Sequence, residues 1–309
     1  MQSEKYDLII IGGGPAGMSA SLYAARQNLK FLLIGEVIGG LANLVPTLKT
    51  YLGFSYLTGY DLISKFKKHL KQYNVQIKNE KVSKIKKDNS DFIVITNEKK
   101  YETKAVIVTT GRRFKHLNIP GEREFKGKGV SDCTACDGPF FKNKTVAVIG
   151  GGRTGLFATL YLLKLAKKIY LIEKEPQIKT TGGLKQFSEV IQKNKKVEIL
   201  LSTYPKQIRG EKFIKDLVLI TKGKEKVLPI EGVFVEIGYI PNIDFLKGLV
   251  NLNDLGEIII DSENRTNQEG IFAAGDVTNL REKQVIVSVG EGAKASLSCV
   301  TYLEKIAGK

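Results

Sequence analysis

The chain has 309 residues, 42% of them hydrophobic, which predicts a globular protein with substantial cores and room for two domains. Its 48 basic and 32 acidic residues give a formal net charge of +16. The basic residues are spread along the chain without interleaved aromatic residues, so we do not expect nucleic-acid binding. The first apolar run is too short for a signal peptide or a membrane span, and the low cysteine count, three, is typical of a cytoplasmic protein.

The N-terminal segment has the pattern of a strand, a glycine turn and a helix. An apolar run at 6–11 precedes the glycine-rich residues 12–17, and a helical pattern follows through Arg26. In such a turn the first glycine permits the tight bend, the second lets backbone approach a pyrophosphate, and the third lets helix and strand pack closely. A second strand at 31–34 ends near Glu36, where a ribose-binding carboxylate is expected.

The next segments predict a helix at 61–73 and strands at 92–96 and 104–109. A basic stretch with proline and glycine follows at 112–121 and is predicted to cross into a second domain.

After this crossing, Cys133 and Cys136 are separated by two residues and followed at once by Asp137. Two such thiols can close a small disulfide, and the vicinal neighbour lowers the pKa of one of them, so the pattern indicates redox chemistry. A carboxyl group beside the second sulfur can supply or accept the proton that moves when a dithiol and a disulfide interconvert. Asp137 is the candidate for that role.

A CxxC pair is also half of a zinc site. The remaining candidate ligands are Cys299, His69 and His116, which do not form a second pair at suitable spacing. Cys299 lies in a helical stretch and is expected to be a small buried side chain, whereas the histidines are expected on the surface. The sequence therefore predicts no metal site.

The strand, turn and helix recur later in the chain, where residues 148–161 repeat the pattern of residues 10–23. The second copy has a strand at 145–149, a glycine turn at 150–155, and a further strand at 169–172 that ends at Glu173. Two such units, each with a terminal acid, predict two dinucleotide-binding domains.

The remaining elements return the chain to the first domain. We predict a buried strand at 232–238, a second crossing at 239–242, a strand at 266–276 and a helix at 285–306. Asp276 ends the last strand, where a carboxylate can hold a ribityl hydroxyl or, alternatively, cap a turn. The helix N-terminus could face the pyrimidine end of a flavin.

At residues 12–17, 109–111, 133–138, 150–155, 273–276 and 284–285 the chain resembles the low-molecular-weight thioredoxin reductases, which are class II FAD-dependent pyridine nucleotide-disulfide oxidoreductases. Segments 136–139, 256–261 and 291–298 are similar to the reductase part of the alkyl hydroperoxide reductase flavoprotein. That protein's N-terminal thioredoxin-like domains have no counterpart in this sequence, so we expect a separate acceptor protein.

The resemblance implies an α/β fold with two Rossmann-like, three-layer ββα domains, the second inserted into the first. Residues 1–114 and 245–309 would bind FAD, and 115–244 would form the inserted NAD(P)H-binding-like domain, which swings about the two crossings. The implied activity is thioredoxin-disulfide reductase, with a thioredoxin- or glutaredoxin-like acceptor and a homodimeric assembly. Cys136 would face the flavin, Cys133 would attack the acceptor disulfide, and Asp137 would donate the proton.

The resemblance also implies two sets of cofactor contacts. Those to FAD are Gly12, Gly14, Pro15, Ala16, Gly17, Glu36, Gly39, Gly40, Thr50, Thr110, Gly111, Gly275, Asp276, Gln284 and Val285. Those to the nicotinamide dinucleotide are Gly150, Gly152, Arg153, Thr154, Gly155 and Glu173.

The sequence departs from that family at both sites. Leu41 and residues 49–50 replace polar residues near the flavin, and residues 173–175, Glu-Lys-Glu, replace an NADPH-specific His-Arg-Arg run, with Lys179 at a later arginine. We therefore expect NADH in preference to NADPH. Phe157 and Ala158 replace an acidic pair, and crowding by Phe157 would favour a ferredoxin or deazaflavin donor instead, for which the basic surface suits an acidic protein.

Two further alternatives remain. A ferredoxin reductase-like flavoprotein shares the fold but lacks the dithiol, and a non-catalytic redox sensor would bind flavin without disulfide turnover.

Overall fold

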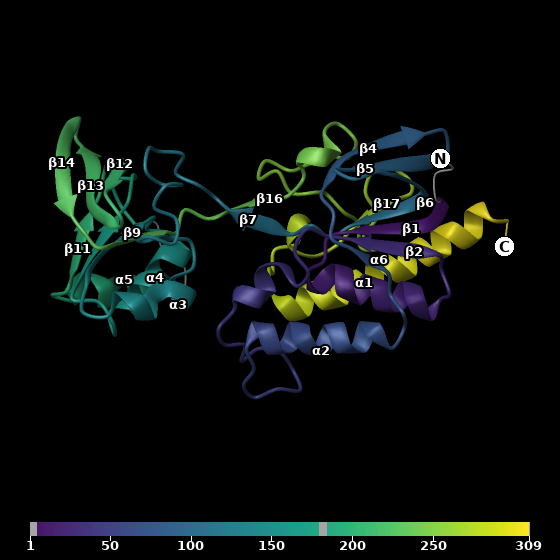
Figure 1. The fold of residues 1–309 in the computed structure, drawn as a ribbon, viewed down its shortest axis with the longest axis horizontal. Coiled ribbons are helices and arrows are strands. Elements are labelled where there is room, and N and C mark those ends of the chain that lie inside the picture. Colours follow the sequence, from purple (N-terminus) through teal and green to yellow (C-terminus); the bar gives the residue numbers. More distant parts are fainter. Residues whose placement is uncertain (1–4, 179–183, 309) are drawn as a thin grey trace. The chain divides into compact units, whose positions relative to one another are not determined.

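The computed structural model describes residues 5–178 and 184–308. Within those ranges no helix has the length and apolar character needed to span a membrane. The chain forms two compact units (Figure 1), the first made of Met1–Arg113 and Ile240–Lys309 and the second of Phe114–Tyr239. The second unit is therefore an insertion in the first.

The first unit is built on a seven-stranded sheet with the order β3-β2-β1-β6-β5-β4, in which β17 also pairs with β6. Strands β1, β2, β3, β6 and β17 run parallel, whereas β4, β5 and β6 pair antiparallel. Residues 8–11 of the central strand β1 are apolar and buried, as expected of a strand in a sheet covered on both faces. The bounds are β1 Lys5–Ile11, β2 Phe31–Ile34, β3 Ile77–Lys78, β4 Val82–Asp88, β5 Asp91–Thr96, β6 Lys100–Val108 and β17 Ile271–Ala273.

Helices α1 (Pro15–Arg26), α2 (Gly59–Lys71) and α6 (Val285–Ile306) lie along one face of this sheet (Figure 1). Helices α1 and α6 approach closely because small residues meet between them: a side chain on Gly292 would lie 2.1 Å from the Ala16 carbonyl oxygen. The other face is covered by residues 243–260 and the short helix η3 (Asp244–Leu246).

The second unit has three layers. Its parallel sheet, with the order β11-β10-β9-β15-β8, packs against helices α4 and α5 on one face and against the antiparallel sheet β12-β13-β14 on the other. The bounds are β8 Val130–Ser131, α3 Thr134–Asp137, β9 Thr145–Ile149, α4 Arg153–Leu162, β10 Lys168–Ile172, α5 Leu184–Lys193, β11 Val197–Leu200, β12 Thr203–Gly210, β13 Ile214–Thr221, β14 Lys224–Pro229 and β15 Gly232–Val235.

The predicted fold class is confirmed: the two units are α/β folds of the Rossmann type. The two segments that connect the units pair as β7 (Arg112–Phe114) and β16 (Tyr239–Pro241). The strand predicted at 266–276 is wrong in length, since within that range only Ile271–Ala273 forms a strand and Gly270, with φ of +83°, turns the chain before it. In the hairpins β4–β5 and β12–β14, the strands β4, β12 and β14 were not predicted, because they are too polar to stand out in the sequence.

Candidate functional site

The first glycine turn has the geometry of a pyrophosphate cradle. Gly12 has φ of +117°, and a side chain there would lie 2.3 Å from the Thr109 carbonyl oxygen, so only glycine fits. A side chain on Gly17 would lie 1.9 Å from the Gly12 oxygen, which is why helix and strand can pack so closely. A side chain on Gly14 would meet nothing within 4 Å, and no side chain caps α1. The first backbone N–H groups of α1 are therefore available for phosphate oxygens.

A second loop packs onto this turn. The Gly39 N–H donates to the Gly13 oxygen at 2.7 Å, and a side chain on Gly40 would lie 3.5 Å from the Gly14 Cα. Glu36, by contrast, is exposed and lies 3.6 Å from the Lys81 ammonium group. Its carboxylate faces solvent, where a ribose could reach it.

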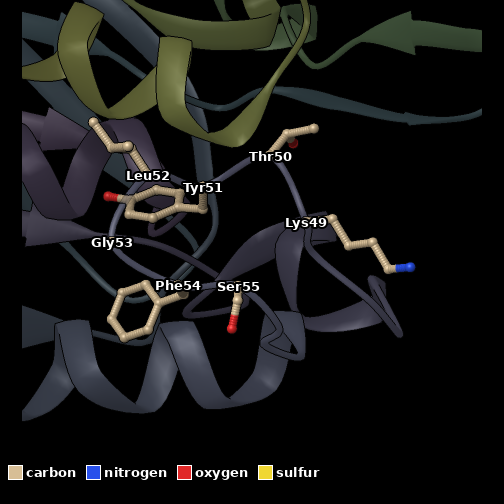
Figure 2. Close-up of a pocket in the computed structure, with 7 residues that line it drawn as sticks. All are labelled: Lys49, Thr50, Tyr51, Leu52, Gly53, Phe54 and Ser55. Atoms are coloured by element: carbon tan, nitrogen blue, oxygen red, sulfur yellow. The ribbon is translucent and has the colours of Figure 1, made fainter.

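Thr110 and Gly111 follow β6, and the Thr110 hydroxyl donates to the Asn242 carbonyl oxygen at 2.6 Å. Thr50 belongs to the 49–55 loop, which lines an open pocket (Figure 2). The Tyr51 ring anchors this loop against Phe54 and Phe66, with ring centroids 6.3 and 6.1 Å away. Thr50 is therefore next to a residue, Tyr51, whose side chain is held by aromatic packing.

Asp276 lies in the short helix η4 (Gly275–Val277), and its carboxylate has two described partners. Arg112 Nη2 lies 3.3 Å from Oδ2, and the Ser288 hydroxyl lies 3.2 Å from Oδ1. These contacts do not support the alternative that Asp276 caps a turn. Arg112 was missed by the sequence reasoning, since its partner is distant in the chain.

The pieces of the predicted FAD site converge in the first unit. A side chain on Gly275 would lie 3.0 Å from the Ala16 Cβ, so η4 sits on the first turn of α1. Gln284 is the N-cap of α6 and makes no side-chain cap, so the N-terminus of α6 at Val285 also keeps free donors. A glycine cradle, two uncapped helix ends and a nearby carboxylate are the chemistry that FAD requires, and the residues present fit it.

The second glycine turn repeats the geometry of the first. Gly150 has φ of +109°, and a side chain there would lie 2.4 Å from the Glu236 carbonyl oxygen. A side chain on Gly155 would lie 1.7 Å from the Gly150 oxygen, and Gly152 is open. Helix α4, like α1, starts without a side-chain cap. This turn also fits a pyrophosphate.

Glu173 sits directly at the second turn. Its Oε2 accepts a hydrogen bond from the Gly151 N–H at 2.6 Å, and its Oε1 accepts one from the Glu175 N–H at 2.9 Å. Each carboxylate oxygen can accept two hydrogen bonds, so each keeps one for a ribose hydroxyl. Lys179, the predicted counterpart of a phosphate-binding arginine, lies outside the described residues.

The second turn of α4 carries an aromatic side chain, Phe157. The Arg153 guanidinium lies 5.6 Å from the Phe157 ring centroid, and the Phe187 ring lies 5.3 Å away. Phe157 remains 42% exposed. The Thr154 hydroxyl is turned inward and donates to the Glu236 carbonyl oxygen at 3.1 Å.

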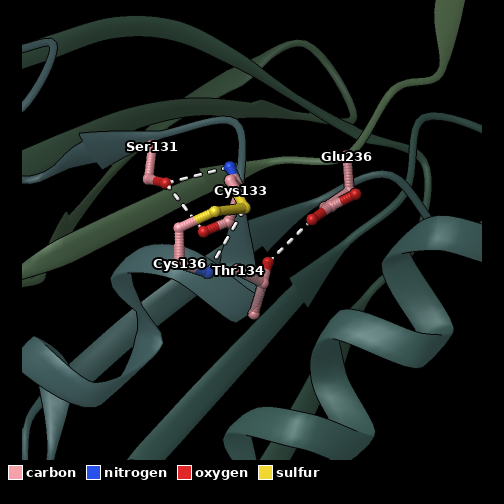
Figure 3. The surroundings of a disulfide bond; sticks show 5 residues. All are labelled: Ser131, Cys133, Thr134, Cys136 and Glu236. Atoms are coloured by element: carbon pink, nitrogen blue, oxygen red, sulfur yellow. Dashed lines mark hydrogen bonds between the residues drawn. A yellow bond between two sulfur atoms is a disulfide. The ribbon is translucent and has the colours of Figure 1, made fainter. Parts of the chain in front are cut away.

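Cys133 and Cys136 form a disulfide with a Cα–Cα distance of 5.3 Å (Figure 3). Cys133 is the N-cap of α3, where its sulfur accepts a hydrogen bond from the Cys136 N–H at 3.2 Å. The Ser131 hydroxyl accepts one from the Cys133 N–H at 3.0 Å. Asp137 is the last residue of α3 and is half-buried.

The third cysteine, Cys299, and His69 belong to the first unit, whereas the disulfide belongs to the second. Cys299 is fully buried in α6, and burial raises the pKa of its thiol far above the ordinary value. His69 and His116 are exposed.

Glu236 is a functional candidate that the sequence reasoning missed. It follows β15, and its Oε1 accepts a hydrogen bond from the Thr134 hydroxyl at 2.7 Å (Figure 3). Burial, with a smaller contribution from the Asp132 charge, raises the pKa of Glu236 to about 7. The available signal was a lone carboxylate in the apolar run at 232–238.

This raised pKa predicts a pH-dependent stability. The folded protein holds the Glu236 proton up to about pH 7, whereas the unfolded chain releases it near the ordinary value of 4.5. Folding stability should therefore fall as pH rises between those values, by about 3 kcal/mol. Glu236→Gln should remove this loss, so that the variant unfolds at higher urea concentration than wild type at pH 8 and not at pH 4. Equal midpoints at both pH values would contradict the assignment.

Comparison with known proteins gives consistent results. The family model described as pyridine nucleotide-disulphide oxidoreductase matches residues 6–292. The chain is 34% identical to a Bacillus subtilis NADH dehydrogenase and 36% identical to a component of the Staphylococcus epidermidis alkyl hydroperoxide reductase. Each match covers 97% of this chain and 59% of the relative, so the chain spans little more than half of their length.

Solved structures match over nearly full length. Lactococcus lactis thioredoxin reductase has a TM-score of 0.83 at 32% identity, with 97% of this chain and 99% of that chain covered. A ferredoxin-flavin thioredoxin reductase from Clostridium acetobutylicum has a TM-score of 0.57 at 34% identity, with 99% and 100% covered.

Proposed function

Since the chain belongs to the pyridine nucleotide-disulphide oxidoreductase family, we propose that it is a thioredoxin-disulfide reductase that acts on a thioredoxin- or glutaredoxin-like protein. The observation that carries this proposal is the Cys133–Cys136 disulfide in the same unit as the second glycine turn. We assign FAD binding to the first unit and dinucleotide binding to the second. The homodimer and the cytoplasmic location remain predictions.

The cysteines would perform the transfer to the acceptor. Bound FAD would supply the two electrons that reduce the Cys133–Cys136 disulfide. The Cys133 thiolate then attacks the acceptor disulfide, which forms a mixed disulfide and releases one acceptor thiolate. The Cys136 thiolate attacks the Cys133 sulfur, so the second acceptor thiolate leaves and the Cys133–Cys136 disulfide forms again. Two protons complete the acceptor dithiol.

Asp137 is proposed to exchange one of these protons, because it directly follows Cys136 at the end of α3. Asp137→Asn should therefore slow turnover with a thioredoxin substrate by about 10²- to 10⁴-fold while the protein keeps its flavin. Stopped-flow measurement of thioredoxin reduction across pH would test this. A rate equal to that of wild type at every pH would remove Asp137 from the mechanism.

We propose NADH as the donor. The support is the position of Glu173 at Gly151, where a negative carboxylate suits ribose hydroxyls and opposes the extra phosphate of NADPH. A relative is named NADH dehydrogenase, which is in line with this choice.

The alternative is a reduced ferredoxin or a deazaflavin. It is favoured by Phe157, which is exposed on the second turn of α4, and by the similarity to a ferredoxin-flavin thioredoxin reductase. The net charge of +16 would also favour encounter with an acidic donor protein.

One experiment tests the function and separates the donors. The yellow purified protein is mixed anaerobically with NADH, NADPH or reduced ferredoxin, the flavin absorbance is followed, and a thioredoxin disulfide is then added. We expect bleaching by NADH and formation of thioredoxin thiols. Bleaching by ferredoxin alone would select the alternative donor, and bleaching without thiol formation from any tested disulfide would overturn the reductase function.

A further inference from the structure

Glu236 joins the disulfide to the second glycine turn through two different parts of the residue. Its carboxyl group holds Thr134, the first residue of α3, which lies between the two cysteines in the sequence. Its main-chain oxygen accepts the hydrogen bond of Thr154 and lies against Gly150. Glu236 therefore contacts both the helix that carries the disulfide and the second glycine turn.

Among the described residues, the one charged side chain that shifts the pKa of Glu236 is acidic. From the segment before α3 Glu236 is faced by Asp132, whose Oδ2 pairs with Lys126 and whose Oδ1 is buried without a hydrogen-bond partner among the described residues. From α3 and α4 it is faced by the hydroxyls of Thr134 and Thr154, and the interaction of its carboxyl group with each hydroxyl favours the charged form. Glu173 is bonded to Gly151 of the same glycine turn. Within the described part of the chain, no basic side chain lowers the pKa of Glu236.

We propose that Glu236 is a positioning residue of the redox centre, which holds the dithiol helix to the glycine turn through Thr134 and controls with its charge how readily the thiols ionise. This rests on the proposed function of Cys133 and Cys136 as the redox pair. When Glu236 is protonated, the site beside the dithiol is neutral. When it is ionised, a negative charge stands there and opposes the formation of a thiolate, which is the nucleophilic form.

The change of state falls in the physiological range, because the buried carboxyl group of Glu236 has a pKa of about 7. Below that pH the neutral form leaves the thiols undisturbed. As pH rises above it, the carboxylate forms and holds back further thiol ionisation. The dithiol of the wild-type protein should therefore gain reactivity less steeply between about pH 7 and pH 9 than an isolated thiol would.

The test measures thiol reactivity directly. The FAD-loaded protein is reduced with excess dithiothreitol, freed of reductant anaerobically, and treated with iodoacetamide from about pH 5.5 to 9.5, with mass spectrometry to locate the label. At about pH 6 wild type and Glu236→Gln should react at the same rate. At about pH 8.5 the variant should react about 3- to 30-fold faster, the effect expected of removing one nearby charge in a partly buried site.

Thr134 offers an independent check. Thr134→Val removes the hydrogen bond that favours the ionised carboxylate of Glu236. The pH at which thiol reactivity falls below that of an isolated thiol should therefore be higher in this variant than in wild type. Thr134→Ser keeps the hydroxyl and should restore the wild-type curve. This pair decides the question by itself if Glu236→Gln does not fold.

Glu231→Gln is the matched control, because Glu231 is exposed and bonds the Thr145 N–H just before the same strand, β15. Its curve should follow wild type, and a change equal to that of Glu236→Gln would mean that net charge, not position, sets the reactivity. Superimposable curves for wild type and Glu236→Gln, or for Thr134→Val and Thr134→Ser, would overturn the proposal. None of these readings needs an electron donor or an acceptor protein, so they are independent of the proposed turnover.

Discussion

Cys136→Ser should abolish electron transfer from the flavin to any protein disulfide, whereas Cys133→Ser should keep a thiol that alters the flavin spectrum. The two sulfurs are bonded to each other in the structure, and we propose different roles for them: Cys136 would contact the flavin and Cys133 would attack the acceptor. The measurement is thioredoxin reduction by the FAD-loaded variants, together with their visible absorbance across pH. We expect both turnover rates at background and a thiolate-dependent band only in Cys133→Ser.

Cys299→Ala is the control for this pair. Cys299 is fully buried in α6, and the raised pKa keeps its thiol protonated, so its removal should leave turnover and spectrum unchanged. Thioredoxin reduction by Cys133→Ser at the wild-type rate would show that the assigned roles of the two cysteines are wrong.

NADPH should bind far more weakly than NADH. Charge-assisted hydrogen bonds contribute roughly 1.5–3 kcal/mol each. Residues 173–175 lack the two arginines of the NADPH-specific run, so NADPH should lose about 3–6 kcal/mol, or about 10²- to 10⁴-fold in affinity. The carboxylate of Glu173, held at Gly151 by a 2.6 Å hydrogen bond, adds repulsion. Flavin bleaching at increasing concentrations of each dinucleotide gives the ratio of the affinities for NADH and NADPH.

Two variants show whether this charge is the cause. Glu173→Gln should weaken NADH binding and bring the affinities for NADH and NADPH closer together. Glu198→Gln, on the neighbouring strand β11, should leave both affinities unchanged, because Glu198 pairs with Lys168 on the surface. Rapid flavin reduction by micromolar NADPH in the wild-type protein would refute the charge argument.

Much of the fold could be predicted from the sequence because its signals are local. Helix α6 spans the predicted residues 285–306, and strands β2 and β9 also match their predicted bounds. The turns at Gly12 and Gly150 were predictable because a backbone with positive φ and a nearby carbonyl admits only glycine. The CxxC spacing brings two sulfurs within bonding reach because the chain turns into helix α3 at Cys133.

The tertiary structure alone decided which distant side chains meet at the site. The Arg112–Asp276 and Thr134–Glu236 contacts join residues 164 and 102 positions apart, and no local pattern specifies such pairs. They form because parallel strands bring their carboxyl ends to one edge of a sheet, where β15 places Glu236 beside the turn after β9. The sequence by itself determined the backbone of the two turns and the dithiol, whereas strand order determined the burial, and hence the ionisation, of the carboxyl group between them.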